Sequence, residues 1–579
     1  MARLSVSFLV FVVASVLSTT GQASQLVGRL PRFDIPDQVV FGSGPTRAEA
    51  SHTADLCPQA QPLSPSKHAD LTATLYELYV SDKFKNRTYE ALIGAVRVPS
   101  ESYDIMGPVG EDPRYEIFSQ LHDYFKAAYP LIHSTLNLTK VNTFGLLYQW
   151  QGSDPSLQPI LLTGHQDVVP INPATLSEWI HPPYAGHYDG TWIWGRGSCD
   201  DKASVTSILT SIEALISHGF KPVRTIVLAF GFDEESAGYE GAGHLAAHLE
   251  ELYGKDSFAA LLDEGSGYLT TFGEDTIFAL PSTSEKGELD IKLEIATLGG
   301  HSSVPPPHTG IGILSAAIVE IESNPHTPGL HRQDTSYATF QCVAEHGPNI
   351  PQQLRVLARK ADEDDEALED FKKLLLSLDP VNHAIMATTQ AVDIIQGGVK
   401  ANALPEVASA VINHRIAEYS SIEELQQHLT SVLLPIVQQF DLALISFGEN
   451  KTVAGSSGKG GHMNLSFAFG SGLQPSPSTP IGTEDIPYQI LSGTIKATLK
   501  NSTVFGDKNV VIAPMLAIGN TDTRFYWNLT GHIFRYVHFN DEDMYNGAHT
   551  VNEAIRAEAL IDAIKFYTTF ILNWDESSA

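Results

Sequence analysis

The sequence predicts an α/β domain with a mixed, mostly parallel sheet, into which a smaller α+β domain is inserted. Strands and helices alternate from about residue 158, which is typical of βαβ units. Near Lys286 the pattern changes, and GELDIKLEIATL alternates apolar and polar residues with a period of two, as a half-exposed strand does. The first pattern returns near Asn509. A hydrophobic fraction of 43% over 579 residues is ordinary for a globular protein with more than one domain.

The N-terminus is typical of a targeting segment. Arg3 precedes an apolar run over residues 4–17, which is shorter than the roughly 20 residues of a membrane-spanning helix. We therefore interpret residues 1–24 as a signal peptide, with an uncleaved membrane anchor as the alternative. Residues 25–67 are rich in Pro, Gly and Ser and are expected to form an irregular arm.

The composition limits the cellular compartments and the binding partners that are compatible with this chain. The chain carries 36 basic and 67 acidic residues, and a net charge of −31 disfavours nucleic acid, which needs a basic binding surface. Three cysteines leave at least one unpaired within the chain and exclude a disulfide-dense scaffold. Sequons for N-glycosylation support a secretory-pathway protein, secreted or vacuolar. They begin at Asn86, Asn137, Asn450, Asn464, Asn501 and Asn528.

The remaining elements follow from hydrophobic periodicity. Helices are expected at residues 71–84, 203–218, 241–253, 310–323, 362–378 and 421–440, and a last element at 553–572. Short buried strands are expected at residues 161–163, 226–232 and 259–262, and further strands at 391–396 and 408–416.

Acidic residues and a histidine follow the ends of the predicted strands, which gather at one edge of an open α/β sheet. They are His165 and Asp167, Asp200 and Asp201, Glu234 and Glu235, and Asp263 and Glu264. So many acids at one edge would repel each other without a cation. Histidine mixed with carboxylates favours catalytic zinc over calcium, which prefers oxygen ligands alone.

The motifs GHQDVVP, GRGSCDDK, DEES, LDEG and NGAHTVNE resemble those of the zinc peptidase family of carboxypeptidase S, aminoacylase and bacterial glutamate carboxypeptidase. The chain is most similar to the carboxypeptidase S group, also called Gly-X carboxypeptidases. The match runs from about Leu71 to the C-terminus. The resemblance implies a phosphorylase/hydrolase-like catalytic domain at residues 68–285 and 448–579, with a lid or dimerisation domain inserted at 286–447.

The resemblance also implies a dinuclear site with two zinc ions per subunit, bridged by Asp200. His165 and Asp263 would complete one metal site, with Glu264 as the alternative to Asp263. Glu235 and His549 would complete the other. Two further roles are implied: Glu234 would be the general base, and Asp167 would orient His165. The bond between Asp200 and Asp201 is expected to be cis.

Three more residues resemble substrate contacts of the family: His301 and Asn402 in the lid, and Arg524, which would grip the substrate's carboxylate. These features imply a zinc carboxypeptidase that removes C-terminal residues. An N-acyl-amino-acid amidohydrolase needs the same site and remains the alternative. A metal-stabilised binding protein without activity is disfavoured because Glu234 is present. Lid-mediated homodimers of the family make a homodimer possible here.

Overall fold

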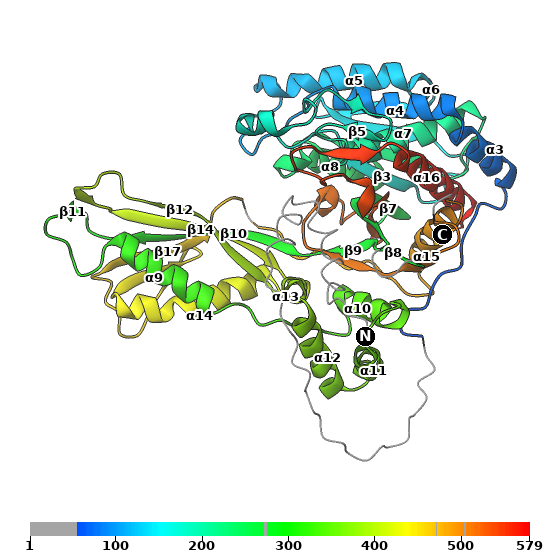
Figure 1. Ribbon diagram of the computed structural model, residues 1–579. Helices are drawn as coiled ribbons and strands as arrows, with labels where there is room; N and C mark the ends of the chain where they lie inside the picture. Colours follow the sequence, from blue (N-terminus) through cyan, green and yellow to red (C-terminus); the bar gives the residue numbers. More distant parts are fainter. Residues whose placement is uncertain (1–54, 271–274, 471, 503–504, 579) are drawn as a thin grey trace, which may run out of the picture.

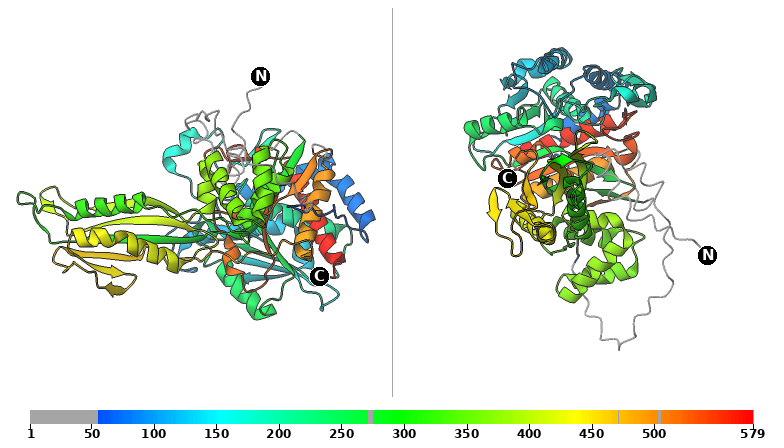
Figure 2. Two further views of the ribbon diagram at one scale, coloured as in Figure 1. Left: turned by 90° about the horizontal axis from the view of Figure 1, so that it is seen from below. Right: turned by 90° about the vertical axis from the view of Figure 1, so that its left-hand side faces the viewer.

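The computed structural model describes residues 55–270, 275–470, 472–502 and 505–578 (Figure 1). The expected signal peptide or anchor and most of the expected arm lie outside these residues. A large domain carries an elongated lid, which extends away from it in Figure 1 and in the left view of Figure 2. In the described ranges, no helix combines the length and the apolar character needed to cross a bilayer.

A mixed sheet forms the centre of the large domain. Its strands are β1 (Asn137–Val141), β2 (Gly145–Trp150), β3 (Ile160–His165), β6 (Ile226–Gly231), β7 (Ala260–Leu269), β8 (Thr276–Ala279), β9 (Ser282–Glu285), β18 (Asn509–Ile512), β19 (Met515–Ala517) and β20 (Ile533–Asn540). The order is β1-β2-β6-β3-β7-β20-β9-β19, with β8 and β18 off this path. Strands β6, β3, β7 and β20 are parallel, and β2 joins β6 antiparallel. The predicted mixed, largely parallel sheet is confirmed.

Helices cover both faces of this sheet, which explains why its central strands are apolar throughout. Alternate residues face opposite sides: Leu162 and Leu228 lie in the core beneath one set of helices, and Leu161 and Val227 lie beneath α8. The first set comprises α4 (Asp82–Val96), α7 (Lys202–Ser217), α15 (Ile486–Lys500) and α16 (Ala559–Glu576), and the other face holds α8 (Ala242–Tyr253). Helices α3 (Ala69–Tyr79), α5 (Ile117–Ala128) and α6 (Pro130–Thr135) complete this domain's N-terminal part (Figure 1).

Two predicted elements have different bounds in the structure. The single helix expected at 71–84 is divided into α3 and α4, because the Ser81 hydroxyl accepts the Phe84 N–H and starts a new helix there. The element expected at 553–572 begins with a short strand, β21 (Ala554–Arg556), which pairs with β5 (Trp192–Trp194). Strand β5 also pairs with β4 (His187–Tyr188).

The lid contains a six-stranded sheet covered by two helices. In sheet order the strands are β12 (Thr389–Gly397), β14 (Val407–Ile416), β10 (Gly287–Ala296), β17 (Gly461–Phe467), β15 (Leu442–Ser446) and β16 (Glu449–Lys451). Helices α9 (Gly310–Ser323) and α14 (Ile422–Gln439) pack on the buried face. Buried and half-buried residues alternate along all of β10, which explains the period of two in its sequence.

The structure corrects the expected lid boundaries of 286 and 447. Strand β17 lies beyond residue 447 but sits in the middle of the lid sheet, between β10 and β15. Helices α10 (Thr335–His346), α11 (Gln352–Ala361), α12 (Asp365–Leu378) and α13 (Pro380–Met386) lie within these bounds. Helices α10 to α12 share a core with Phe278 of β8 and Val511 of β18, so they belong with the large domain. Local periodicity does not reveal which domain an element packs against.

A disulfide joins the arm to the large domain. Cys57 is bonded to Cys342 of α10, and Cys199 is buried and free. Further along the arm, the Leu63 N–H donates to the Gly493 carbonyl of α15. The described part of the arm is therefore fixed against the domain that carries the site.

Candidate active site

The predicted acids converge at the carboxyl edge of the large sheet. His165 ends β3, Asp200 precedes α7, Glu234 and Glu235 begin a short 3-10 helix after β6, and Glu264 lies in β7. His549 comes from a loop that precedes β21 and has a φ of 60°, in the left-handed region. The peptide bond between Asp200 and Asp201 is cis, as expected.

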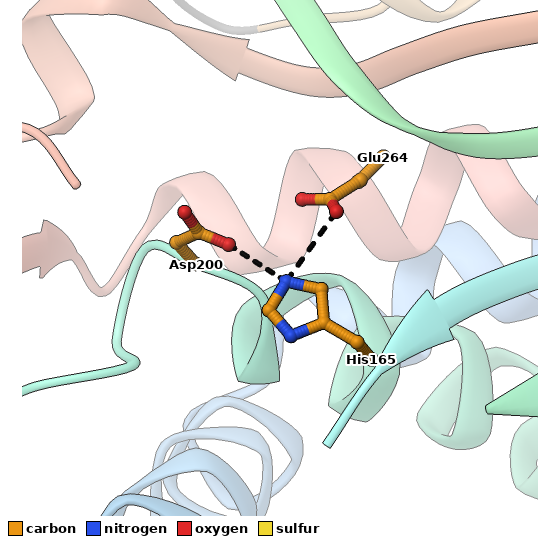
Figure 3. Close-up of side chains that lie close together, drawn as sticks. All are labelled: His165, Asp200 and Glu264. Carbon is orange, nitrogen blue, oxygen red and sulfur yellow. Dashed lines mark hydrogen bonds and ion pairs between the residues drawn. The ribbon is translucent and has the colours of Figure 1, made fainter. Parts of the chain in front are cut away.

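Two groups of side chains have the donors and the spacing for metal ions. In the first, His165 Nε2 lies 2.9 Å from Asp200 Oδ1 and 3.3 Å from Glu264 Oε1 (Figure 3). In the second, His549 Nε2 lies 2.9 Å from Glu235 Oε1 and 3.1 Å from Asp200 Oδ2. Asp200 thus presents one oxygen to each group, as a bridging ligand would.

The structure corrects one expected ligand. Asp263 is in neither group, and its Oδ1 accepts a hydrogen bond from Thr163 Oγ1 at 2.7 Å. Consecutive residues of a strand point to opposite sides, so Asp263 and Glu264 cannot both face the cluster. Glu264, the alternative, faces His165 (Figure 3).

The electrostatics of the cluster favour bound cations. Burial, and then the charge of Glu264, raises the pKa of Glu234 well above its usual range. Burial also raises the pKa of Glu264, although nearby His165 opposes the shift. His549 behaves in the complementary way: burial lowers its pKa, but contacts with Asp200 and Glu235 outweigh burial and raise it to about 11. Carboxyls with raised pKa values beside a histidine with a raised pKa are typical of a cation-binding site. A bound metal ion would supply the positive charge that the ionised carboxylates need.

Asp167 connects several parts of the cluster. Its Oδ1 lies 3.3 Å from His165 Nδ1, and its two oxygens accept the N–H groups of Glu234 and Glu235 at 3.2 and 3.1 Å. The Ser102 hydroxyl donates to Asp167 Oδ2 at 2.6 Å. Asp167 therefore lies where it can orient His165, and it also holds the backbone of the segment that carries Glu234. Ser102 could not be predicted from the sequence, because no local pattern distinguishes it from other serines.

A cavity of about 1200 Å³ opens onto the cluster. Its lining includes Asp200, Glu234, Glu235, Glu264, His549 and Arg524. The Arg524 guanidinium lies over the rings of Tyr239 and Phe525 and donates to the Ala237 carbonyl at 2.8 Å. Because Ala237 follows the 3-10 helix Glu234–Ser236, Arg524 is hydrogen-bonded to the same part of the site as Glu234 and Glu235.

The two lid residues are not brought to this cavity within one chain. His301 belongs to β11 (Gly300–His301), which pairs with β13 (Ala403–Leu404) beside Asn402. Both side chains are exposed, and neither lines the cavity. Strand β11 lies at the end of the lid that is remote from the large domain (Figure 1).

The sequence profile of peptidase family M20/M25/M40 matches residues 161–573. The chain belongs to this family. Among the relatives of this M20 peptidase, carboxypeptidase S of Saccharomyces cerevisiae is 38% identical over 90% of this chain and 89% of its own. The N-fatty-acyl-amino acid synthase/hydrolase of Mus musculus is 31% identical over 84% of this chain and 87% of its own. The predicted class, a metal-dependent hydrolase, is confirmed.

Solved M20-like structures share the fold of this M20 peptidase at low sequence identity. Human carnosine dipeptidase 1 matches with a TM-score of 0.58 and 14% identity, over 89% of this chain and all of its own. An M20 family metallo-carboxypeptidase from Sulfolobus solfataricus matches with a TM-score of 0.54 and 17% identity, over 84% and 99%. The architecture of a catalytic domain with a lid is consistent with both.

Proposed function

We propose that this M20 peptidase is a zinc carboxypeptidase that hydrolyses the peptide bond next to a free C-terminal carboxylate. The observation that carries the proposal is the pair of three-donor groups sharing Asp200, with Glu234 and Arg524 lining the same cavity. Carboxypeptidase S, with 38% identity over most of both chains, supports the substrate class.

In the proposed mechanism, His165, Asp200 and Glu264 would hold one zinc ion, and Asp200, Glu235 and His549 would hold the other. When bound, the two ions lower the pKa of water and polarise the scissile carbonyl. Glu234 takes the proton of the attacking water and passes it to the leaving amine. Asp167 keeps the His165 ring and the backbone of Glu234 in place while this happens.

Substrate is held by Arg524, whose planar guanidinium is suited to a carboxylate with two parallel hydrogen bonds. We further propose that His301 and Asn402 reach the cavity from a second copy of the chain in a homodimer. The support is that both are exposed at the lid's remote end, next to the exposed apolar side chains Leu298 and Val304.

The choice between the two adjacent acids of β7 gives a direct test of the ligand set. We expect Glu264→Gln to weaken zinc binding and to abolish most turnover, because it removes a charged donor facing His165. Asp263→Asn, the matched control, should retain the zinc content of the wild type, because Asp263 contacts Thr163 instead. Zinc per chain is measured by mass spectrometry after dialysis and distinguishes the two acids. Loss of zinc in Asp263→Asn but not in Glu264→Gln would identify Asp263 as the ligand.

The carboxylate clamp is tested with blocked dipeptides that carry either a free or an amidated C-terminus. We expect hydrolysis of the free acid only, and a fall of about 10–100-fold in kcat/KM for Arg524→Ala, since hydrogen bonds to charged groups contribute roughly 1.5–3 kcal/mol. Arg556→Ala is the control, because Arg556 also stacks on a ring, that of Trp192, but does not line the cavity. Equal hydrolysis of acid and amide by the wild type would exclude a carboxypeptidase.

A second candidate, an N-acyl-amino-acid amidohydrolase, is favoured by the apolar side chains at the cavity. Ile105, Tyr239 and Phe469 line it although they are 86%, 57% and 62% exposed. Solvent-exposed apolar groups around a polar centre suit a substrate with an apolar acyl chain. The ratio of kcat/KM for an N-fatty-acyl amino acid to that for a blocked dipeptide separates the two functions.

The proposal places the mature protein in the secretory pathway, secreted or in the vacuole. The disulfide between Cys57 and Cys342 supports an oxidising compartment. The sequon residues Asn86 and Asn450 are exposed and accessible to a glycan.

A further inference from the structure

Glu553 is a completely buried carboxylate that belongs to neither metal-binding group. It lies four residues after His549, at the start of the segment that leads into β21. A buried carboxylate is costly unless its oxygens accept hydrogen bonds or meet a positive charge. Its partners therefore indicate what it stabilises.

Both oxygens of Glu553 are directed at the loop that presents Asp200. Oε1 accepts the backbone N–H of Cys199 at 2.8 Å, and Cys199 directly precedes Asp200. Oε2 accepts from Nη1 of Arg196, which is also buried. The carboxylate thus grips the loop at two points, one of them next to the bridging ligand.

Main-chain contacts reinforce this connection. The Glu553 carbonyl accepts the Gly195 N–H at 2.9 Å, and the Cys199 thiol donates to the Ala554 carbonyl at 3.4 Å. The strand pairing of Ala554 with Trp194 continues the same contact. Cys199 and Glu553 are 354 residues apart in the sequence. Their segments are therefore held together beside the site by both side-chain and main-chain contacts.

We propose that Glu553 is a positioning residue that fixes Asp200 relative to His549, so that the group of Asp200, Glu235 and His549 can bind its metal ion. This inference rests on the proposed metal-dependent function. His549 has a left-handed backbone conformation and a side chain that is 31% exposed, and its Nε2 contacts Asp200 and Glu235. Asp200 Oδ2 stays 3.1 Å from His549 Nε2 only while the two segments keep their separation.

The substitution Glu553→Gln would weaken the contacts with Cys199 and Arg196, while the side chain would keep nearly the same size. An amide offers one acceptor oxygen, whereas the Cys199 N–H and Arg196 need two. One donor would then face an NH₂ group, and the Asp200 loop would shift or loosen. Residues that hold metal ligands in place typically contribute about 10–100-fold to metal affinity.

The test compares Glu553→Gln with Glu213→Gln in the full-length mature protein. Glu213 is a matched control: it is buried, it accepts the N–H groups of Leu131 and Ile132 at 3.2 and 2.9 Å, and it pairs with Arg87. It does not line the cavity. Zinc affinity is measured by competition with a chromophoric chelator, and zinc per chain by mass spectrometry. The absorption spectrum of cobalt-substituted protein reports the ligand geometry.

We expect Glu553→Gln to lose one zinc ion per chain at a chelator concentration at which wild type and Glu213→Gln keep both. The affinity of the weakened site should fall by about 10–100-fold, and the cobalt spectrum should change. Equal zinc affinity and an unchanged spectrum in Glu553→Gln would overturn the proposal. A wild type without zinc would instead refute the proposed function itself.

If Glu553→Gln does not fold, the double variant Arg196→Met with Glu553→Gln provides the test instead. It removes both members of the buried ion pair, and such replacements leave no uncompensated charge. If the double variant folds and loses one zinc ion, the positioning role is supported. If it folds and keeps both ions with wild-type affinity, the role is refuted.

Discussion

Replacing Glu234 with glutamine is expected to lower kcat by about 10²–10⁴-fold, the usual contribution of a general base. The amide cannot take a proton from water or return it to the leaving amine. Both metal ions should stay bound, because Glu234 lines the cavity but belongs to neither three-donor group. Steady-state kinetics on a blocked dipeptide and zinc analysis of the same sample measure the two effects.

Glu240→Gln provides the comparison. Glu240 follows in the same loop, where its carboxylate accepts from Asn142 at 2.7 Å, and it does not line the cavity. Its substitution should leave kcat within about two-fold, as expected for sites away from the chemistry. Wild-type turnover in Glu234→Gln would show that Glu234 is not the general base. Loss of zinc in that variant would assign it a structural role.

Removal of metal should abolish hydrolysis and change how stability depends on pH. We expect dialysis against a strong chelator to eliminate measurable turnover, and added zinc to restore it. Each bound ion stabilises the folded state by about 4 kcal/mol when its concentration is 1,000 times the Kd. The melting temperature of the chelated protein should therefore fall relative to the loaded protein.

The sign of the pH effect follows from the raised pKa values in the cluster. In the metal-free protein Glu234 and Glu264 keep their protons above the pH at which they ionise in the unfolded chain, and so does His549, whose pKa is about 11. Unfolding then releases protons, so rising pH favours the unfolded state. Asp200, with a lowered pKa, acts in the opposite sense only below about pH 4.

Between about pH 5 and pH 9, we therefore expect the chelated protein to lose stability by roughly 1.4 kcal/mol per pH unit for each proton released. The zinc-loaded protein should vary less, because bound metal displaces these protons. Thermal melts of both forms across this range measure the difference. Parallel curves would mean that no metal occupies the cluster, and full activity after chelation would exclude the proposed mechanism.

Much of the fold was predictable because it depends on local periodicity. Helix α9 and the region of β10 were identified from the sequence, since burial alternates along a strand and repeats every turn of a helix. The break at Ser81 was missed, because the apolar spacing continues across it while the capping hydroxyl starts a second helix. The place of β17 in the lid sheet could not be predicted, because its partner β10 is distant in sequence and its other partner β15 is parallel, so that neither pairing leaves a local signal.

The sequence by itself determined the family and the acids at the strand ends, because these reside in short motifs whose residue types set the chemistry. Only the tertiary structure shows that Glu264, and not Asp263, faces His165, because one register step turns a side chain to the other face of a strand. It alone shows the contacts of Ser102 with Asp167 and of Glu553 with Cys199, because hydrogen bonds between remote segments form only after folding has brought them together.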